Sequence, residues 1–148
     1  MANISALSAY RQTRIKTASQ GQLIIMLYDG GISTLDHALE LLRHKSERRK
    51  DPSKIEEIGK AIIKAQEIIT ELMVSLDFEQ GGKIAENLFA LYTWFNKELL
   101  EAHITSDAAR ILAVRNSLFD IRKSWAEIIA KNSAKERLET ESGINIAG

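Results

Sequence analysis

The sequence contains no cysteine, which excludes disulfide bonds, thiolate zinc sites and cysteine nucleophiles. Its single proline and eight glycines are too few for a β architecture built from many short strands and turns. No apolar run approaches the roughly 18 residues that cross a membrane, and the N-terminus lacks the basic start and apolar core of a signal peptide. We therefore expect a helical, cytoplasmic protein that does not insert into membranes.

The chain also lacks an excess of either charge, because its 20 Lys and Arg residues balance its 20 Asp and Glu residues. A nucleic-acid-binding protein normally carries a basic surplus that replaces counterions at the phosphates. Basic residues gather locally between Arg43 and Lys50, but Glu47 and Asp51 dilute them. This pattern is typical of a solvated loop, and it predicts no nucleic-acid partner.

The chain has 148 residues, 45% of them hydrophobic, which fits one domain with a packed core. Apolar residues recur three and four positions apart in four segments, which predicts helices at 19–44, 53–76, 83–104 and 107–134. Ser19, Ser53 and Ser106 are their predicted N-terminal caps. Short connections make successive helices antiparallel. The predicted fold is an all-α, antiparallel four-helix bundle at 19–134, with an N-terminal arm at 1–18 and a flexible tail at 135–148.

The helices carry more apolar residues than one core stripe needs. The core of the first helix is predicted to use Leu23, Leu27, Leu35, Ala38 and Leu42, and that of the third Ile84, Leu88, Leu91, Phe95, Leu99 and Ala102. The residues left over are Ile24 or Ile25, Tyr28, the stripe Ala85, Phe89 and Tyr92, and Ile63, Ile68, Met73 and Val74. Contiguous apolar surface marks an interaction site, but a wide core or the arm, with Ile4, Leu7, Tyr10 and Ile15, would also cover it.

Candidate catalytic and metal sites are weak. His37, Glu40 and His44 share a face of the first helix, but no Glu-x-x-His pair of the di-iron type is present. No Gly-x-Ser-x-Gly elbow or phosphate-binding loop occurs either. We expect no enzyme activity, no cofactor and no metal.

Two glycine pairs and two polar residues have a double interpretation. Gly81-Gly82 is predicted to bend the chain between the second and third helices, whereas Gly30-Gly31 falls inside the first helix. The inner pair indicates either a close approach of another segment or a kink. Asp29 and Asn87 are either exposed side chains or hydrogen-bonding partners for the backbone of a bound segment.

Two long motifs resemble the FliS family of flagellar secretion chaperones. The first is Thr-Ala-Ser-Gln-Gly-Gln-Leu-Ile-Ile-Met-Leu-Tyr-Asp-Gly at 17–30, with Tyr10 upstream. The second runs from Ala65 to Tyr92 and includes Leu76, Asp77, Glu79, Gly81, Gly82, Ile84, Ala85, Asn87, Leu88 and Leu91, while Trp125 stands where the last helix of the family has a Trp. The chain departs from the family pattern at Gln20, where Pro is common, and at Gly31, where Ala is frequent.

This resemblance implies a cytoplasmic chaperone that binds the disordered C-terminal segment of flagellin, prevents premature polymerisation and supports flagellar type III export. It also implies an arm that folds over the binding surface, and components of the export apparatus as further partners. The hypothesis for the partner-binding residues is Tyr10, Ile25, Tyr28, Asp29, Ile68, Asn87, Phe89 and Tyr92. The alternative is a self-associating structural bundle, a homodimer without a flagellin client.

Overall fold

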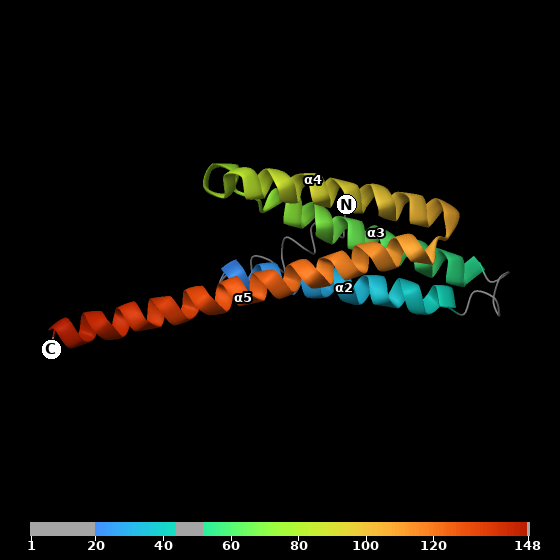
Figure 1. Cartoon of the computed structure of the whole chain (residues 1–148). Helices are drawn as coiled ribbons and strands as arrows, with labels where there is room; N and C mark the ends of the chain where they lie inside the picture. The colour runs from blue at the N-terminus through green and yellow to red at the C-terminus, as the bar shows by residue number, and fades with distance from the viewer. Residues whose placement is uncertain (1–19, 44–51, 148) are drawn as a thin grey trace.

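The computed structural model describes residues 20–43 and 52–147, and it describes 141–147 by their backbone alone. The described residues form four α-helices and no strand. The helices are α2 (Gln20–Arg43), α3 (Pro52–Val74), α4 (Phe78–Thr105) and α5 (Ala108–Ala147). Figure 1 shows them side by side in a bundle, which confirms the predicted all-α fold. Tyr10, Ser19 and the predicted arm at 1–18 lie outside the described residues.

The helices are arranged in a ring, in which α2 and α4 each contact both α3 and α5. Two cross-helix ion pairs establish that α2 and α5 are antiparallel. Asp36 of α2 pairs with Arg115 of α5, whereas Asp29, earlier in α2, pairs with Arg122, later in α5. The contact between α4 and α5 is the least extensive of the four. Figure 1 shows these two helices separating from each other with distance from their connecting turn.

The core runs along the inside of this ring. All five predicted core residues of α2 are buried, which confirms the stripe read from its sequence. The other helices contribute Ile62, Ala65, Ile68, Ile69, Leu72, Ala85, Tyr92, Phe95, Leu99, Ala102, Ile111, Val114 and Leu118. Apolar side chains at three- and four-residue spacing therefore cover one another across the bundle axis.

The turn between α3 and α4 is set by Asp77 rather than by the glycine pair. The Asp77 carboxylate accepts hydrogen bonds from the backbone N–H groups of Glu79 (3.0 Å) and Gln80 (3.1 Å), which caps α4. Gly82 then lies inside α4 with φ of 48°, a left-handed conformation that favours glycine. The predicted bend at Gly81-Gly82 is therefore confirmed as a kink, but it separates the first turn of α4 from the rest of that helix, because Asp77 begins α4 before the pair.

The turn between α4 and α5 also differs from the prediction. Ser106 is the C-terminal cap of α4, with a left-handed φ of 57° and its N–H bonded to the Ala102 carbonyl. Asp107 caps α5 instead, since its carboxylate accepts from the Ala109 N–H at 3.0 Å. Ser106 thus ends α4 and Asp107 begins α5, and this keeps the connection short.

α5 continues to Ala147, well past the helix end predicted near Ala134. Figure 1 shows this helix extending beyond the other three toward the C-terminus. The predicted end followed the loss of the apolar stripe, but Ala, Lys, Glu, Arg and Leu between 134 and 139 have high helix propensity and sustain the helix without a packing partner. The boundaries at 18 and 134 as limits of an arm, a bundle and a flexible tail stay predictions.

Candidate functional site

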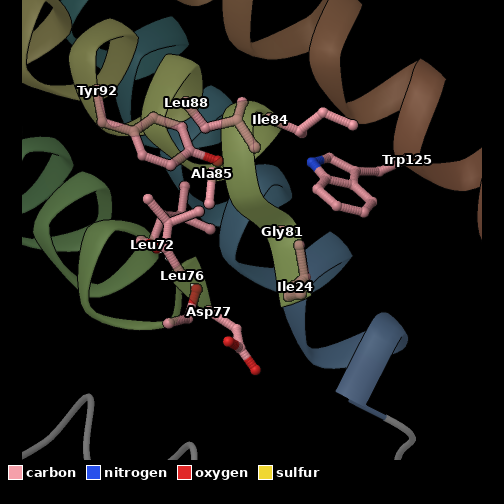
Figure 2. A pocket seen from close by; sticks show the side chains of 11 residues that line it. Ile24, Leu72, Leu76, Asp77, Gly81, Ile84, Ala85, Leu88, Tyr92 and Trp125 are labelled. Atoms are coloured by element: carbon pink, nitrogen blue, oxygen red, sulfur yellow. Dashed lines mark hydrogen bonds between the residues drawn. The ribbon is translucent and has the colours of Figure 1, made fainter. Parts of the chain in front are cut away.

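A pocket of about 200 Å³ opens at the end of the bundle where α2 begins and α3 turns into α4. Ile24 of α2 and Trp125 of α5 contribute to it beside residues of α3 and α4 (Figure 2). The full lining is Ile24, Leu72, Ser75, Leu76, Asp77, Gly81, Ile84, Ala85, Leu88, Tyr92 and Trp125. Apolar side chains make up most of this lining, so the pocket is suited to an apolar guest group.

The pocket exists because α4 and α5 separate at this end of the bundle. The capping of Asp77 and the kink at Gly82 fix the first turn of α4 above the end of α3. Ile84, one position outside the core stripe of α4, keeps 67% of its surface exposed because α5 does not reach it. An apolar side chain of this size that remains in water gains about 1.5–3 kcal/mol when a partner covers it.

The floor of the pocket holds a hydrogen-bonded cluster of Tyr28, Tyr92 and Trp125, the tyrosine cluster. The Tyr28 and Tyr92 hydroxyls share a short hydrogen bond that joins α2 to α4 across the bundle. The Trp125 indole N–H donates to the Tyr28 oxygen. Tyr28 and Tyr92 are both buried, whereas Trp125 is partly exposed and lines the pocket.

Burial is the largest influence on both phenols. It raises the pKa of Tyr28, although the hydrogen bonds with Tyr92 and Trp125 partly offset it. Burial and the neighbouring Tyr28 raise the pKa of Tyr92 well above its ordinary range. Both hydroxyls are therefore neutral at physiological pH, and they act as hydrogen-bond donors and acceptors rather than as charges.

Two ion pairs connect α2 to α5. The Asp29 carboxylate contacts Arg122 through Nε (2.5 Å) and a terminal nitrogen (3.4 Å), and Asp36 contacts Arg115 at 2.9 Å. The Arg115 guanidinium also lies over the Phe119 ring, 5.2 Å from its centroid. Asp29, predicted to bind the backbone of a guest, is thus engaged with Arg122 within the chain.

Three of the predicted partner-binding residues are not on the surface. Tyr28 and Tyr92 are buried in the tyrosine cluster, and Ile68 is buried between α2 and α4 in the core. The expectation that they flank the core is wrong, because the core of this bundle is wider than one stripe per helix. Tyr92 nevertheless lines the pocket from its floor.

The observed core stripe of α4 differs from the predicted one for a simple geometric reason. Ala85, Leu88, Tyr92, Phe95, Leu99 and Ala102 alternate three and four positions apart, and this set faces the bundle axis. Ile84 and Leu91, which were assigned to the core, lie one position away toward α5 and are exposed or partly exposed. Two overlapping stripes share this helix, and periodicity alone favoured the wrong one at its N-terminal half.

The remaining predicted residues lie nearer the surface. Ile25 is partly buried, Asn87 is exposed, and Phe89 is 44% exposed. The Phe89 ring packs edge-on against Phe78 in the first turn of α4, with centroids 5.9 Å apart, and it does not line the pocket. The predicted set is therefore not one contiguous surface.

Sequence reasoning missed the side chains that surround the opening. Leu88 was predicted to lie in the core, and Trp125 was noted for its match to the last helix of the family. The available signal was the combination of Trp125 with two tyrosines, since a buried indole or phenol needs a hydrogen-bond partner and these residues often meet.

The candidate metal residues have other partners. His37 lies 3.5 Å from Glu57 of α3, and Glu40 pairs with Arg43 at 2.8 Å, while His44 lies outside the described residues. No group of three or more His, Cys, Asp or Glu residues suited to a metal ion occurs in the described part of the chain. Among the described helices, none is long and apolar enough to cross a membrane.

Known proteins with similar sequences share one description. The family model of the flagellar protein FliS matches residues 1–132. The flagellar secretion chaperone FliS of Salmonella typhimurium is 36% identical over 141 residues, which cover 92% of this chain and 98% of the relative. FliSB of Pseudomonas aeruginosa is 33% identical (82% of this chain, 94% of the relative), and FliS of Escherichia coli is 31% identical (82% and 85%). The chain belongs to the FliS family of flagellar proteins.

Proposed function

We propose that this chain is a cytoplasmic flagellar secretion chaperone that binds the disordered C-terminal segment of flagellin. By holding that segment it prevents premature polymerisation and keeps the subunit ready for type III export, for which export apparatus components are further partners. The observation that carries this proposal is the apolar pocket near the start of α4, where α4 and α5 lie apart. Family membership supports the chaperone role.

The pocket suits a client that folds on binding. A disordered segment loses conformational entropy when it is ordered, so its binding needs extensive apolar contact. An amphipathic helix that lays its apolar face against a groove supplies such contact. Ile84, Leu88 and Trp125 offer apolar surface next to one another, and the pocket between them accepts one larger side chain.

In this proposal, some of the predicted partner-binding residues contact the guest directly and others act only through the fold. Ile25, Asn87 and Phe89 remain proposed contacts at the surface, with Tyr10 in the arm. Tyr92 would contact the guest from the pocket floor, while Tyr28, Ile68 and Asp29 would act indirectly by holding α2, α3 and α5 in place. The guest contacts added here are those of Ile24, Ile84, Leu88 and Trp125.

The proposed chaperone acts through binding equilibrium rather than through a chemical reaction. Flagellin subunits need the apolar residues of their terminal segments for packing against one another, so a chaperone that covers these residues competes with polymerisation. No covalent step is required. The strength of this competition depends on how much apolar surface is buried in each complex.

The test is a matched pair of substitutions on α4. Ile84 at the pocket is 67% exposed, and Ile104 at the far end of the same helix is 71% exposed, so neither supports the core. Ile84→Glu should weaken binding of a flagellin C-terminal peptide about 10-fold or more, because it removes about 1.5–3 kcal/mol of apolar burial. Ile104→Glu should leave affinity unchanged. Isothermal titration calorimetry measures both.

Two results would contradict the proposal. One is a wild-type protein that does not bind the peptide, and the other is equal affinity of the Ile84→Glu and wild-type proteins. The alternative of a self-associating bundle predicts a stable dimer whose mass by light scattering is unaffected by flagellin.

A further inference from the structure

The tyrosine cluster holds more hydrogen-bond donors than its internal bonds use. Tyr28, Tyr92 and Trp125 each contribute one polar hydrogen, and the indole N–H only donates. The Trp125 N–H bonds to the Tyr28 oxygen, and the Tyr28–Tyr92 bond uses one phenolic hydrogen. The other phenolic hydrogen has no acceptor among the described residues.

The position of this unused hydrogen follows from the surroundings of the two rings. If Tyr92 donates to Tyr28, the unused hydrogen belongs to Tyr28, which is 0% exposed and surrounded by core side chains. If Tyr28 donates to Tyr92, the unused hydrogen belongs to Tyr92, which lines the pocket. Buried donors almost always find an acceptor. The second arrangement allows water in the open pocket to be that acceptor, so the bonds run from Trp125 to Tyr28 to Tyr92 and then into the pocket.

The other polar groups of the pocket lining are already engaged. The Ser75 hydroxyl donates to the Leu72 carbonyl at 2.7 Å, and the Asp77 carboxylate accepts the two capping hydrogen bonds of α4. Figure 2 shows the Tyr92 oxygen pointing in among the apolar lining residues. Tyr92 is thus the polar donor that the described lining presents to a guest inside an otherwise apolar site.

We propose that the Tyr92 hydroxyl is a specificity-determining donor that selects a guest carrying a carbonyl oxygen next to the apolar group that enters the pocket. This inference rests on the proposed function, since the guest is the flagellin segment. A guest that displaces water without offering an acceptor leaves the Tyr92 hydrogen unsatisfied, which disfavours binding. A guest with a carbonyl restores the bond in surroundings of low polarity, where the preceding donors of the chain strengthen it.

The experiment compares two substitutions that remove a hydroxyl from the same cluster. Tyr92→Phe should weaken binding of a flagellin C-terminal peptide about 10-fold, as expected for one lost hydrogen bond of a buried donor. Tyr28→Phe also removes a hydroxyl from this buried cluster but keeps the Tyr92 donor, so its affinity should fall by less than that of Tyr92→Phe. Circular dichroism establishes that both variants are folded, and calorimetry gives the affinities.

Nuclear magnetic resonance can distinguish a Tyr92 hydroxyl that contacts the peptide from one that only stabilises the fold. In protein with isotopically labelled tyrosines, the Tyr92 hydroxyl hydrogen should exchange with water more slowly in the complex than in the unbound protein. A residue that only supports the fold would exchange equally in both states. A peptide with every Asn and Gln replaced by Ala identifies the source of the carbonyl: the effect of Tyr92→Phe persists for a backbone carbonyl and disappears for a side-chain amide.

The outcomes are distinguishable. Binding of Tyr92→Phe within about twofold of wild type overturns the inference but leaves the proposed function intact, as does an equal loss in Tyr28→Phe and Tyr92→Phe. Absence of binding by the wild-type protein overturns the proposed function, and the inference with it.

Discussion

At the scale of single residues, two buried phenols combine roles that are usually separate. Tyr28 and Tyr92 fill the core as aromatic side chains, and their hydroxyls join diagonal helices and end at the pocket. A polar group inside a core is costly unless it is hydrogen-bonded. The cluster therefore favours the arrangement in which α2 and α4 bring the two buried phenols together, because separating them would leave buried hydroxyls without this bond.

The raised pKa values of both phenols predict a dependence of stability on alkaline pH. The unfolded chain loses its phenolic protons near the ordinary pKa of 10.0, whereas the folded state retains them. The stabilising contribution is thus complete below this pH and is lost as the pH rises above it, by up to about 1.4 kcal/mol per pH unit for each tyrosine.

Urea denaturation between about pH 8 and about pH 11 measures this effect. The double variant Tyr28→Phe/Tyr92→Phe should be less stable than wild type at neutral pH but should lose less stability toward the alkaline end. Parallel pH profiles for the two proteins would contradict the assignment to these phenols.

At the scale of elements, α2 contains a glycine pair that its geometry does not require. The helix runs without interruption from Gln20 to Arg43, so the kink, one of the two interpretations of Gly30-Gly31, does not occur. A Cβ atom on Gly30 would lie 3.5 Å from the Ile68 side chain, and one on Gly31 would lie 3.5 Å from Leu118. These are ordinary van der Waals separations, which fit the close approach of neighbouring side chains without excluding alanine.

Gly31→Ala should therefore stabilise the bundle. Alanine in a helix interior is favoured over glycine by about 1 kcal/mol, and the added methyl group contacts Leu118 and Ile68 without a clash. The control is Gly82→Ala in the kink of α4, where the left-handed φ of 48° should make alanine destabilising. Thermal denaturation of both variants checks the opposite signs, and a lower melting temperature for Gly31→Ala would refute the prediction.

At the scale of the whole molecule, the projecting part of α5 is separable from the bundle. From Lys131 to Thr140 its side chains are exposed, apart from the partly buried Ala134. This segment is helical through its own propensity rather than through core packing.

Removal of residues 135–148 should change the free energy of unfolding by less than about 0.5 kcal/mol, since the side chains at 135–140, where the structure describes them, are exposed. The helical signal in circular dichroism should fall in proportion to the shorter chain. Urea denaturation of the truncated and full-length proteins compares their stability, and a loss above about 1 kcal/mol would show that the segment packs on the bundle.

Much of the fold follows from local spacing. The core stripe of α2 lies where three- and four-residue periodicity put it, because a helix buries one face and the spacing of its apolar residues determines which face that is. Asp77 shows the limit of such reading. Its capping role competes with the strong turn signal of Gly81-Gly82, and only the positions of the hydrogen-bonding groups decide between them.

The sequence predicted the residues of the candidate site less well than it predicted the fold. Tyr28 and Phe89 both looked like surplus apolar residues, yet one is buried and the other exposed. Their difference depends on which faces of α2 and α4 the neighbouring helices cover, which is decided by the packing of the helices and not by either stripe.

The sequence by itself determined an all-α bundle without thiol chemistry, with family motifs between 17 and 92, because composition and periodicity act locally along the chain. Only the tertiary structure decided that two tyrosines and a tryptophan from three helices meet, and that a pocket opens beside them. Such a meeting depends on the register and separation of whole helices, which arise from the packing of all their side chains together.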